Sequence, residues 1–149
     1  MSAVIFLDSS PLGVLSNPRQ TARVTACWHW LRALQAAGRR VIVPEIADYE
    51  VRREFIRASL TLSVSALDQL AQQLEYLPLN TAAMRLAADL WAQARQQGQP
   101  TAGDNTIDGD VILAAQALSL GVPDVLIATN NIGHIARFVP AEVWQNIPP

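Results

Sequence analysis

Short apolar runs that alternate with longer helix-forming segments are the feature of this chain that most limits its fold. Residues 4–7, 41–44 and 125–128 are apolar throughout. Runs of this length and composition are typical of strands buried on both faces of a sheet. Between the first two lies the segment 21–37, in which apolar residues form one helical stripe. Alternating strands and helices favour a parallel sheet with helices on both faces and right-handed crossovers.

Capping and turn residues set the expected boundaries of the elements. Strands are expected at 4–7, 41–44, 76–79 and 125–128, and the tail, with Val143, Trp144 and Ile147, is expected to add an edge strand. Helices are expected at about 21–37, 45–60, 63–74, 81–97 and 108–120. Asn80 is the expected N-cap of the fourth helix, and Ser63 or Ser65 that of the third. Residues 9–20, broken by prolines and a glycine, are expected to form a loop, and 96–106 a flexible stretch.

Length and composition indicate one globular domain spanning residues 1–149. No apolar stretch approaches the roughly 20 residues needed to cross a bilayer, and the N-terminus lacks the features of a signal peptide. The single cysteine, Cys27, cannot form an internal disulfide and is expected to be a small core residue. We therefore expect a cytoplasmic protein with no membrane contact.

The basic residues are all arginine, and the chain contains no lysine. This excludes a P-loop, which needs its lysine on the phosphates, and Schiff-base chemistry, which needs a lysine amine. Arginine is suited to bidentate phosphate contacts and to stacking on bases. Genomic base composition is an equally good explanation of the bias.

Three acidic residues lie at the ends of apolar segments. Asp8 follows the run at 4–7, Glu50 comes after the run at 41–44, and Asp110 precedes Val111. The carboxyl ends of parallel strands face one crevice, where ligands bind in open α/β sheets. Gathered carboxylates resist ionising together unless a cation compensates them, and hard oxygen ligands suit Mg²⁺ or Mn²⁺. The pattern therefore predicts a metal-dependent enzyme.

The helix expected after the second strand carries four acids, Glu45, Asp48, Glu50 and Glu54. Most of them must be ordinary surface charges. Glu45 has a structural role near the positive end of the helix dipole. Glu50 and Glu54 lie one turn apart on the same face, so spacing alone cannot choose a ligand between them.

The remaining acids also have structural explanations. Asp8 could simply start a turn, because aspartate favours turns. Asp104, Asp108 and Asp110 stand before or at a helix start, where Asp108 would be a good N-cap and Asp110 would favour the dipole. Asp108 and Asp110 point different ways in a regular helix. At most one of them is therefore expected to bind a metal directly unless Asp108 lies outside the helix.

Several other chemistries find no support in the sequence. His29 and His134 lie far apart and make no zinc pattern, and no Ser–His–Asp or Cys–His arrangement is convincing. A phosphatase of the haloacid dehalogenase type would need a second aspartate where Ser10 stands. No Gly-x-Gly-x-x-Gly motif is present.

Four segments together resemble a PIN domain, and more narrowly the VapC-type toxins of bacterial toxin–antitoxin pairs. They are Phe-Leu-Asp-Ser-Ser at 6–10, Pro-Glu-Ile-Ala-Asp-Tyr-Glu-Val-Arg-Arg-Glu at 44–54, Asp-Val-Ile-Leu-Ala-Ala-Gln-Ala at 110–117 and Ile-Ala-Thr-Asn-Asn at 127–131. The resemblance covers nearly the whole chain in the right order. It implies a three-layer α/β/α fold with a central parallel sheet of four to five strands.

The resemblance also implies a function: an Mg²⁺- or Mn²⁺-dependent endoribonuclease that hydrolyses RNA phosphodiester bonds, is often a homodimer and is silenced by a small antitoxin protein. The three catalytic acids of the family match Asp8, Glu50 and Asp110, which would hold the metal directly or through water. The metal would generate a hydroxide nucleophile and stabilise charge on the phosphate. The residues expected to position phosphate or water are Ser9, Ser10, Thr129 and Asn131.

Asn131 departs from the family pattern, which often has a fourth aspartate at this position. Asparagine supplies no charge, so we expect one well-occupied metal without substrate and a gain in Mn²⁺ binding from Asn131→Asp. Asp108 is a further candidate metal ligand that could compensate. The alternative is that Asn131 merely caps the turn after the fourth strand.

Two further expectations concern alternatives and partners. A non-catalytic PIN-like RNA-binding or scaffold subunit would keep the fold, but it should have lost one of the three acids. A DNA nuclease of the flap type carries more acids than this length permits. Trp28 and Trp30 cannot both face one core from the same helix, so one should lie at a contact or against another segment. With Trp91, they predict self-association and binding of a partner chain.

Overall fold

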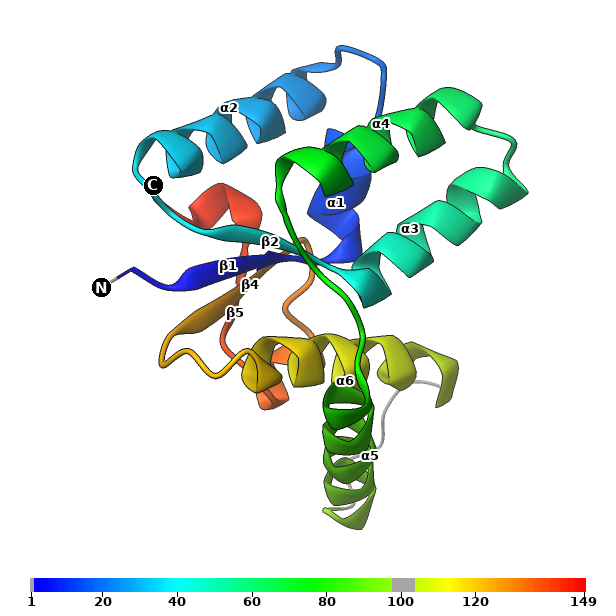
Figure 1. Ribbon diagram of the computed structural model, residues 1–149, viewed down its shortest axis with the longest axis vertical. Helices are drawn as coiled ribbons and strands as arrows, with labels where there is room; N and C mark the ends of the chain where they lie inside the picture. Colours follow the sequence, from blue (N-terminus) through cyan, green and yellow to red (C-terminus); the bar gives the residue numbers. More distant parts are fainter. Residues whose placement is uncertain (1, 98–103) are drawn as a thin grey trace.

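The computed structural model describes residues 2–97 and 104–149, and the side chains of 104–107 are not described. Five parallel strands form one sheet in the order β3-β2-β1-β4-β5 (Figure 1). The strands are β1 (Val4–Leu7), β2 (Val41–Pro44), β3 (Glu75–Leu77), β4 (Val125–Thr129) and β5 (Ala141–Val143). The helices are α1 (Ser9–Leu15), α2 (Ala22–Ala36), α3 (Glu45–Arg57), α4 (Thr61–Gln73), α5 (Thr81–Gln96) and α6 (Asp104–Ser119). Short 3-10 helices cover Ile135–Arg137 and Trp144–Asn146.

Alternate residues of the strands face two hydrophobic layers. Ile5 and Leu7 of β1 belong to a core cluster with residues of α1–α4, whereas Phe6 belongs to a second cluster with residues of α6. In Figure 1, α1–α4 accordingly cover one face of the sheet, and α6 covers the other with α5 beside it. All four residues of β1 are buried. The predicted three-layer α/β/α arrangement with a five-stranded parallel sheet is confirmed.

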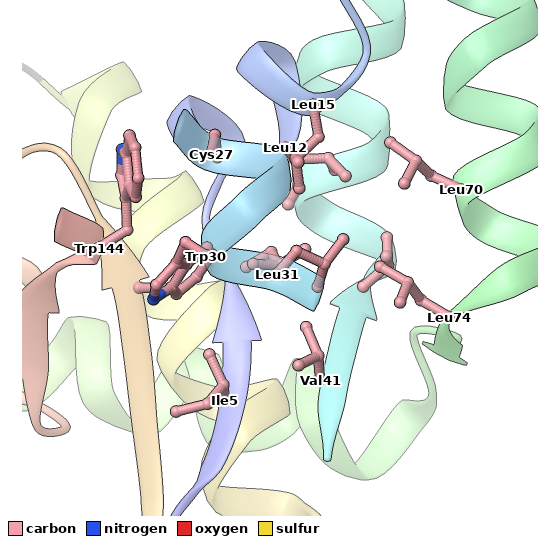
Figure 2. Close-up of a cluster of buried hydrophobic side chains, with 14 of the residues drawn as sticks. Ile5, Leu12, Leu15, Cys27, Trp30, Leu31, Val41, Leu70, Leu74 and Trp144 are labelled. Atoms are coloured by element: carbon pink, nitrogen blue, oxygen red, sulfur yellow. The ribbon is translucent and has the colours of Figure 1, made fainter. Parts of the chain in front are cut away.

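The C-terminal segment packs onto the face covered by α2. The rings of Trp30 and Trp144 lie 5.5 Å apart between centroids at an angle of 52° (Figure 2). The indole N–H of Trp30 also donates to the carbonyl oxygen of Ile147 at 3.0 Å. Trp30 therefore lies against another segment, as the helical spacing predicted, while Trp28 is only partly buried. Cys27 is buried beside them, and burial raises the pKa of its thiol to about 12, consistent with an unreactive core residue.

Residues 9–15 form a helix where a loop was predicted. Asp8 is the N-cap of α1, and its side chain accepts a hydrogen bond from the backbone N–H of Ser9 at 2.7 Å. Pro11 lies in the first turn, where its missing N–H has no intrahelical partner to lose. The predicted loop is wrong, because a proline in the first turn after an N-cap is compatible with a helix.

Other boundaries also differ from the prediction. α4 begins at Thr61 with no side-chain cap, so neither Ser63 nor Ser65 is its N-cap. α3 ends at Arg57, because Ser59 adopts a positive φ of 58° that ends the helical path. α6 begins at Asp104, four residues before the predicted start.

The predicted flexible stretch at 96–106 overlaps both neighbouring helices. Gln96 is the last residue of α5, and 104–106 belong to α6. Residues 98–103 of the stretch lie outside the described residues. Among the described residues, no helix is long and apolar enough to span a bilayer.

Candidate active site

Asp8 lies where β1 ends and α1 begins, and two neighbours fix its carboxylate. Its Oδ1 accepts from the backbone N–H of Ser9, and its Oδ2 accepts from the hydroxyl of Thr129 at 2.8 Å. Thr129 is the last residue of β4, which pairs with β1 in parallel. The carboxyl ends of the two central strands therefore meet at the Asp8 side chain.

Glu50 and Asp110 both lie close enough to Asp8 to be affected by its negative charge. Burial and then the charge of Asp8 raise the pKa of Asp110 to about 6, although His134 and Arg137 oppose the shift. Burial and then Asp8 also raise the pKa of Glu50, to which Asp110 adds a smaller contribution in the same direction. Three carboxylates from β1, α3 and α6 thus share one electrostatic environment.

Gly109 allows the close approach of α3 to α6 at this site. A Cβ added at Gly109 would lie 2.5 Å from Oε2 of Glu50. No such atom exists in glycine, so the Glu50 carboxylate can lie against the backbone beside Asp110. Gly109 lies just before the segment 110–117 that carries the resemblance, and its role depends on a contact between two helices that spacing along the chain does not reveal.

Gln116 positions α6 against the rest of the molecule and was missed by sequence reasoning. Its buried side chain accepts from the backbone N–H of Ile46 at 3.1 Å and donates to the carbonyl oxygen of Leu77 at 2.9 Å. These two bonds tie α6 to the first turn of α3 and to the end of β3. A buried amide in an apolar helix segment was the available clue, because such a group requires partners.

The serines after Asp8 and the loop after β4 are linked to one another. The Ser10 hydroxyl accepts from the backbone N–H of Asn130 at 2.9 Å, and the Ser9 hydroxyl lies 3.4 Å from Asp8 Oδ1. Asn131 donates its backbone N–H to the Thr129 hydroxyl at 3.1 Å. Ser9 and Thr129 therefore bond to Asp8, and Ser10 ties the start of α1 to the loop after β4.

The Asn131 side chain is engaged in its own turn. Its Oδ1 accepts from the backbone N–H of Gly133 at 3.1 Å, which is the arrangement of an asparagine that caps a turn. This is the structural alternative for Asn131 that the sequence left open. In this arrangement its side-chain oxygen does not need a metal as a partner.

Asp108 is not among the charges that shift the pKa values of Glu50 and Asp110. Asp108 is an exposed residue within α6 and not its N-cap, contrary to the structural explanation suggested by the sequence. It lines a pocket together with Glu50 of α3. The side chain of Asp104 lies outside the described part of the structure.

The other acids of α3 have structural partners. Glu45 accepts from the backbone N–H of Leu79 at 2.7 Å, and Glu54 forms an exposed ion pair with Arg57 at 2.9 Å. Glu50 is therefore the acid of this helix that takes part in the carboxylate environment. The resemblance selected the same residue where helical spacing could not.

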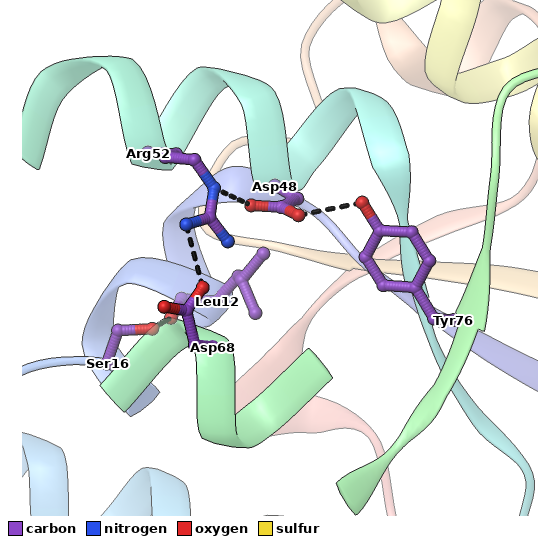
Figure 3. A network of polar contacts seen from close by, with 6 residues as sticks. All are labelled: Leu12, Ser16, Asp48, Arg52, Asp68 and Tyr76. Atoms are coloured by element: carbon purple, nitrogen blue, oxygen red, sulfur yellow. Dashed lines mark hydrogen bonds and ion pairs between the residues drawn. The ribbon is translucent and has the colours of Figure 1, made fainter. Parts of the chain in front are cut away.

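The expectation that most acids of this helix are ordinary surface charges is wrong. Of the four acids only Glu54 is exposed, and the most buried is Asp48. It is only 7% exposed, accepts from the Tyr76 hydroxyl at 2.7 Å and pairs with Arg52 at 2.9 Å (Figure 3). Arg52 also pairs with Asp68 of α4 at 2.8 Å. The network joins α3, α4 and β3, and the spacing of four residues between Asp48 and Arg52 could have suggested part of it.

The carboxylate oxygens of this site are the ligands that a hard divalent cation prefers. Asp8 raises the pKa of both other acids, and a cation between them would relieve this repulsion. Within residues 2–97 and 108–149, no three His, Cys, Asp or Glu side chains are already close enough together to hold an ion.

Comparison with known proteins identifies the fold. No protein-family model matches the sequence, and no curated protein is similar to it. Solved structures do match. A chain of VapBC2 from Rickettsia felis, bound to a promoter DNA fragment, is 18% identical with a TM-score of 0.73 over 95% of this chain and 98% of that one. The chain has the VapC-type PIN fold.

Two further structures share this PIN fold over almost their full length. A chain of DNA-bound VapBC from Salmonella typhimurium is 17% identical with a TM-score of 0.71, covering 96% of this chain and 99% of that one. VapC20 of Mycobacterium tuberculosis, a toxin that cleaves the sarcin–ricin loop, is 17% identical with a TM-score of 0.62, covering 97% and 99%. The predicted fold class is therefore confirmed by similarity in three dimensions.

Proposed function

We propose that this protein is a divalent-metal-dependent endoribonuclease and the toxin of a toxin–antitoxin pair. One observation carries the proposal. On a PIN fold, Asp8 at the end of β1 lies close enough to Glu50 of α3 and Asp110 of α6 for its charge to raise the pKa of both. The structural relatives include a toxin that cleaves RNA in the sarcin–ricin loop. The retention of Asp8, Glu50 and Asp110 favours an enzyme over a non-catalytic subunit with the same fold.

Asp8, Glu50 and Asp110 would hold Mg²⁺ or Mn²⁺, directly or through water. The ion, when bound, supplies an activated water and stabilises charge on the phosphate. The Thr129 hydroxyl and the Ser9 N–H keep the Asp8 carboxylate in one orientation. Arg137 is close enough to Asp110 to lower its pKa, so it also places positive charge where an RNA phosphate would approach.

The test is cleavage of a defined single-stranded or structured RNA by purified protein, with and without Mg²⁺ or Mn²⁺. Asp8→Asn keeps the shape of the side chain but removes its charge, so we expect a loss of cleavage of at least about 100-fold. Asp124→Asn is the matched control, because Asp124 is an exposed aspartate before β4, at the opposite end of the sheet.

The two variants give a clear outcome. Loss of cleavage in Asp8→Asn but not in Asp124→Asn supports the proposal. Cleavage at the wild-type rate by Asp8→Asn would indicate a contaminating nuclease and overturn it. A wild-type protein that binds RNA but never cleaves it, with either metal, would favour the non-catalytic RNA-binding subunit.

The proposal includes a small antitoxin partner, a homodimer and a cytoplasmic location. The structural relatives include VapBC complexes. Ile56, Leu60 and Leu62, which are 62%, 48% and 70% exposed, place apolar surface around the connection between α3 and α4. Such surface is typical of protein contacts. Light scattering of the isolated protein at tens of micromolar tests self-association, and a strict monomer would exclude the homodimer.

A further inference from the structure

A pocket adjoins the carboxylate site between α3 and α6. It is lined by Ile46, Tyr49, Glu50 and Arg53 of α3 and by Asp108 and Ile112 of α6. Glu50 belongs both to this pocket and to the carboxylate site. A group that occupied the pocket would therefore lie next to the place where the proposed reaction occurs.

Tyr49 gives the pocket an exposed aromatic wall. Its side chain is 55% exposed and lies outside the buried clusters formed by the described residues. The guanidinium carbon of Arg53 lies 5.0 Å from the centroid of its ring. Tyrosine rings and arginine guanidinium planes are the groups on which proteins stack unpaired bases. A base could therefore stack on the exposed ring of Tyr49, beside Arg53 or in its place.

The charges of the pocket favour a base over a phosphate in its interior. Glu50 is assigned to the metal ion, so Asp108 is the carboxylate of the pocket that repels phosphate oxygens and accepts hydrogen bonds from amino groups. The exocyclic amino groups of adenine, cytosine and guanine are such donors, whereas uracil has none. Arg53 is the cation of the pocket and could contact the neighbouring phosphate.

We propose that this pocket takes an unpaired nucleobase of the RNA next to the phosphate that is cleaved, with Tyr49 as the stacking surface and Asp108 as the acceptor for an exocyclic amino group. This inference rests on the proposed ribonuclease function. It makes Tyr49 a residue for substrate affinity and Asp108 a residue for base preference. It also gives Asp108 a role other than that of a metal ligand.

The first experiment tests stacking by binding. Short fluorescent RNA oligomers of adenylate, cytidylate or uridylate are titrated with protein in the Asp8→Asn background, which prevents cleavage, in the presence of Mn²⁺. Loss of one stacking contact should weaken binding by about 5- to 150-fold in Tyr49→Ala. Tyr49→Phe keeps the ring and should bind about as well as the unaltered protein.

Trp91→Ala is the matched control for this experiment. Trp91 is 37% exposed and also has an arginine, Arg95, 4.7 Å from its ring centroid, but it lies on α5 and does not line the pocket. Loss of binding in Tyr49→Ala alone supports the inference. Unchanged binding in Tyr49→Ala, or an equal loss in Trp91→Ala, would overturn it.

The second experiment tests base preference. The unaltered pocket should bind adenylate and cytidylate oligomers more tightly than uridylate oligomers. Asp108→Asn should narrow this difference, because an amide can also donate to the O4 of uracil. A preference that Asp108→Asn leaves intact would overturn the role of Asp108.

The outcomes separate this inference from the proposed function. In one outcome, Tyr49→Ala cleaves RNA with the wild-type KM and kcat while Asp108→Asn keeps the wild-type base preference. That result would contradict the nucleobase pocket and leave the ribonuclease proposal intact. A raised KM in Tyr49→Ala, with nearly constant kcat and an unchanged melting temperature, supports the nucleobase pocket. A purely structural defect would lower the melting temperature. A wild-type protein without any RNA cleavage would contradict the ribonuclease proposal itself.

Discussion

The carboxylate of Glu50 lies so close to the backbone of Gly109 that a Cβ at position 109 would stand 2.5 Å from Glu50 Oε2. The two residues come from α3 and α6, which Gln116 holds together through Ile46. The contact involves the end of a flexible side chain, so a methyl group at position 109 would displace the carboxylate and leave the helices in place. Binding at the site and folding stability can therefore be separated by one substitution.

We predict that Gly109→Ala lowers RNA cleavage and Mn²⁺ affinity by at least about tenfold. Its stability should be unchanged or higher by roughly 0.5–1 kcal/mol, because alanine is favoured over glycine within a helix. Kinetic assays and urea unfolding measure the two effects. Gly13→Ala in α1 is the control, since a Cβ there would meet no atom within 4 Å. Full activity in Gly109→Ala would show that the position of Glu50 is not critical.

Strands β1 and β2 could be predicted because each is a run of consecutive apolar residues. Every residue of β1 and β2 is buried, so neither strand depends on an unusual partner. α1 could not be predicted from the same rules, because Pro11 and Gly13 argue against a helix. Its formation depends on Asp8, which caps it and at the same time bonds to Thr129 far along the chain.

The candidate site was predictable only in part. The position of Asp8 followed from its place at a strand end, whereas Glu50 was chosen among neighbouring acids only by the resemblance. The charge coupling of Glu50 and Asp110 to Asp8 depends on how α3 and α6 pack. Packing of this kind is not encoded in local spacing. The spacing of Asp48 and Arg52 likewise indicates only part of the buried network, which Tyr76 joins from β3.

Glu50 should be the metal ligand of α3. We predict that Glu50→Gln lowers Mn²⁺ affinity by at least about tenfold in calorimetric titrations, because it removes an anionic oxygen from the shared site. Glu54→Gln is the matched control and should bind Mn²⁺ like the wild type, since Glu54 pairs with Arg57 at an exposed position. A large loss in Glu54→Gln with Glu50→Gln unaffected would overturn the assignment.

The stability of the metal-free protein should fall as the pH rises from about 4 to about 7. The pKa of Asp110 is raised from its ordinary value of 3.8 to about 6, so the folded state holds this proton more tightly than the unfolded state. The stabilisation is complete below pH 3.8, the ordinary pKa of this carboxyl. It is lost as the pH rises past about 6, the pKa of Asp110 in the folded protein. With allowance for solvent screening, we expect a loss on the order of 1–2 kcal/mol.

Urea unfolding at several pH values measures this effect, and Asp110→Asn should make the profile flatter. Mn²⁺ should stabilise the protein more at pH 7 than at pH 5, because both raised carboxyls must ionise to bind it. A stability that rises over this interval in the wild type but not in Asp110→Asn would contradict the sign of the shift.

The buried network around Asp48 should stabilise the fold without affecting the site. We predict that Asp48→Ala lowers the free energy of unfolding by about 1.5–3 kcal/mol, because it removes bonds to Arg52 and Tyr76 that involve a charged group. Arg57→Ala breaks an exposed ion pair and should change the stability little. Mn²⁺ affinity should be unchanged in both variants, and a loss in Asp48→Ala would link the network to the metal.

Asn131→Asp should leave the number of bound metal ions unchanged. The fourth aspartate of related toxins suggested a gain from this substitution, but the Asn131 side chain accepts from the Gly133 N–H and its backbone N–H donates to Thr129. Aspartate forms the same turn, so the new carboxylate should stay on the Gly133 N–H.

Calorimetric titration with Mn²⁺ measures the stoichiometry of the Asn131→Asp variant. Asn130→Asp adds the same charge at the adjacent exposed position and controls for attraction at a distance. Equal, small changes in affinity in the two variants would confirm that Asn131 caps the turn, whereas a second bound ion in Asn131→Asp alone would show that its side chain can rotate to the metal.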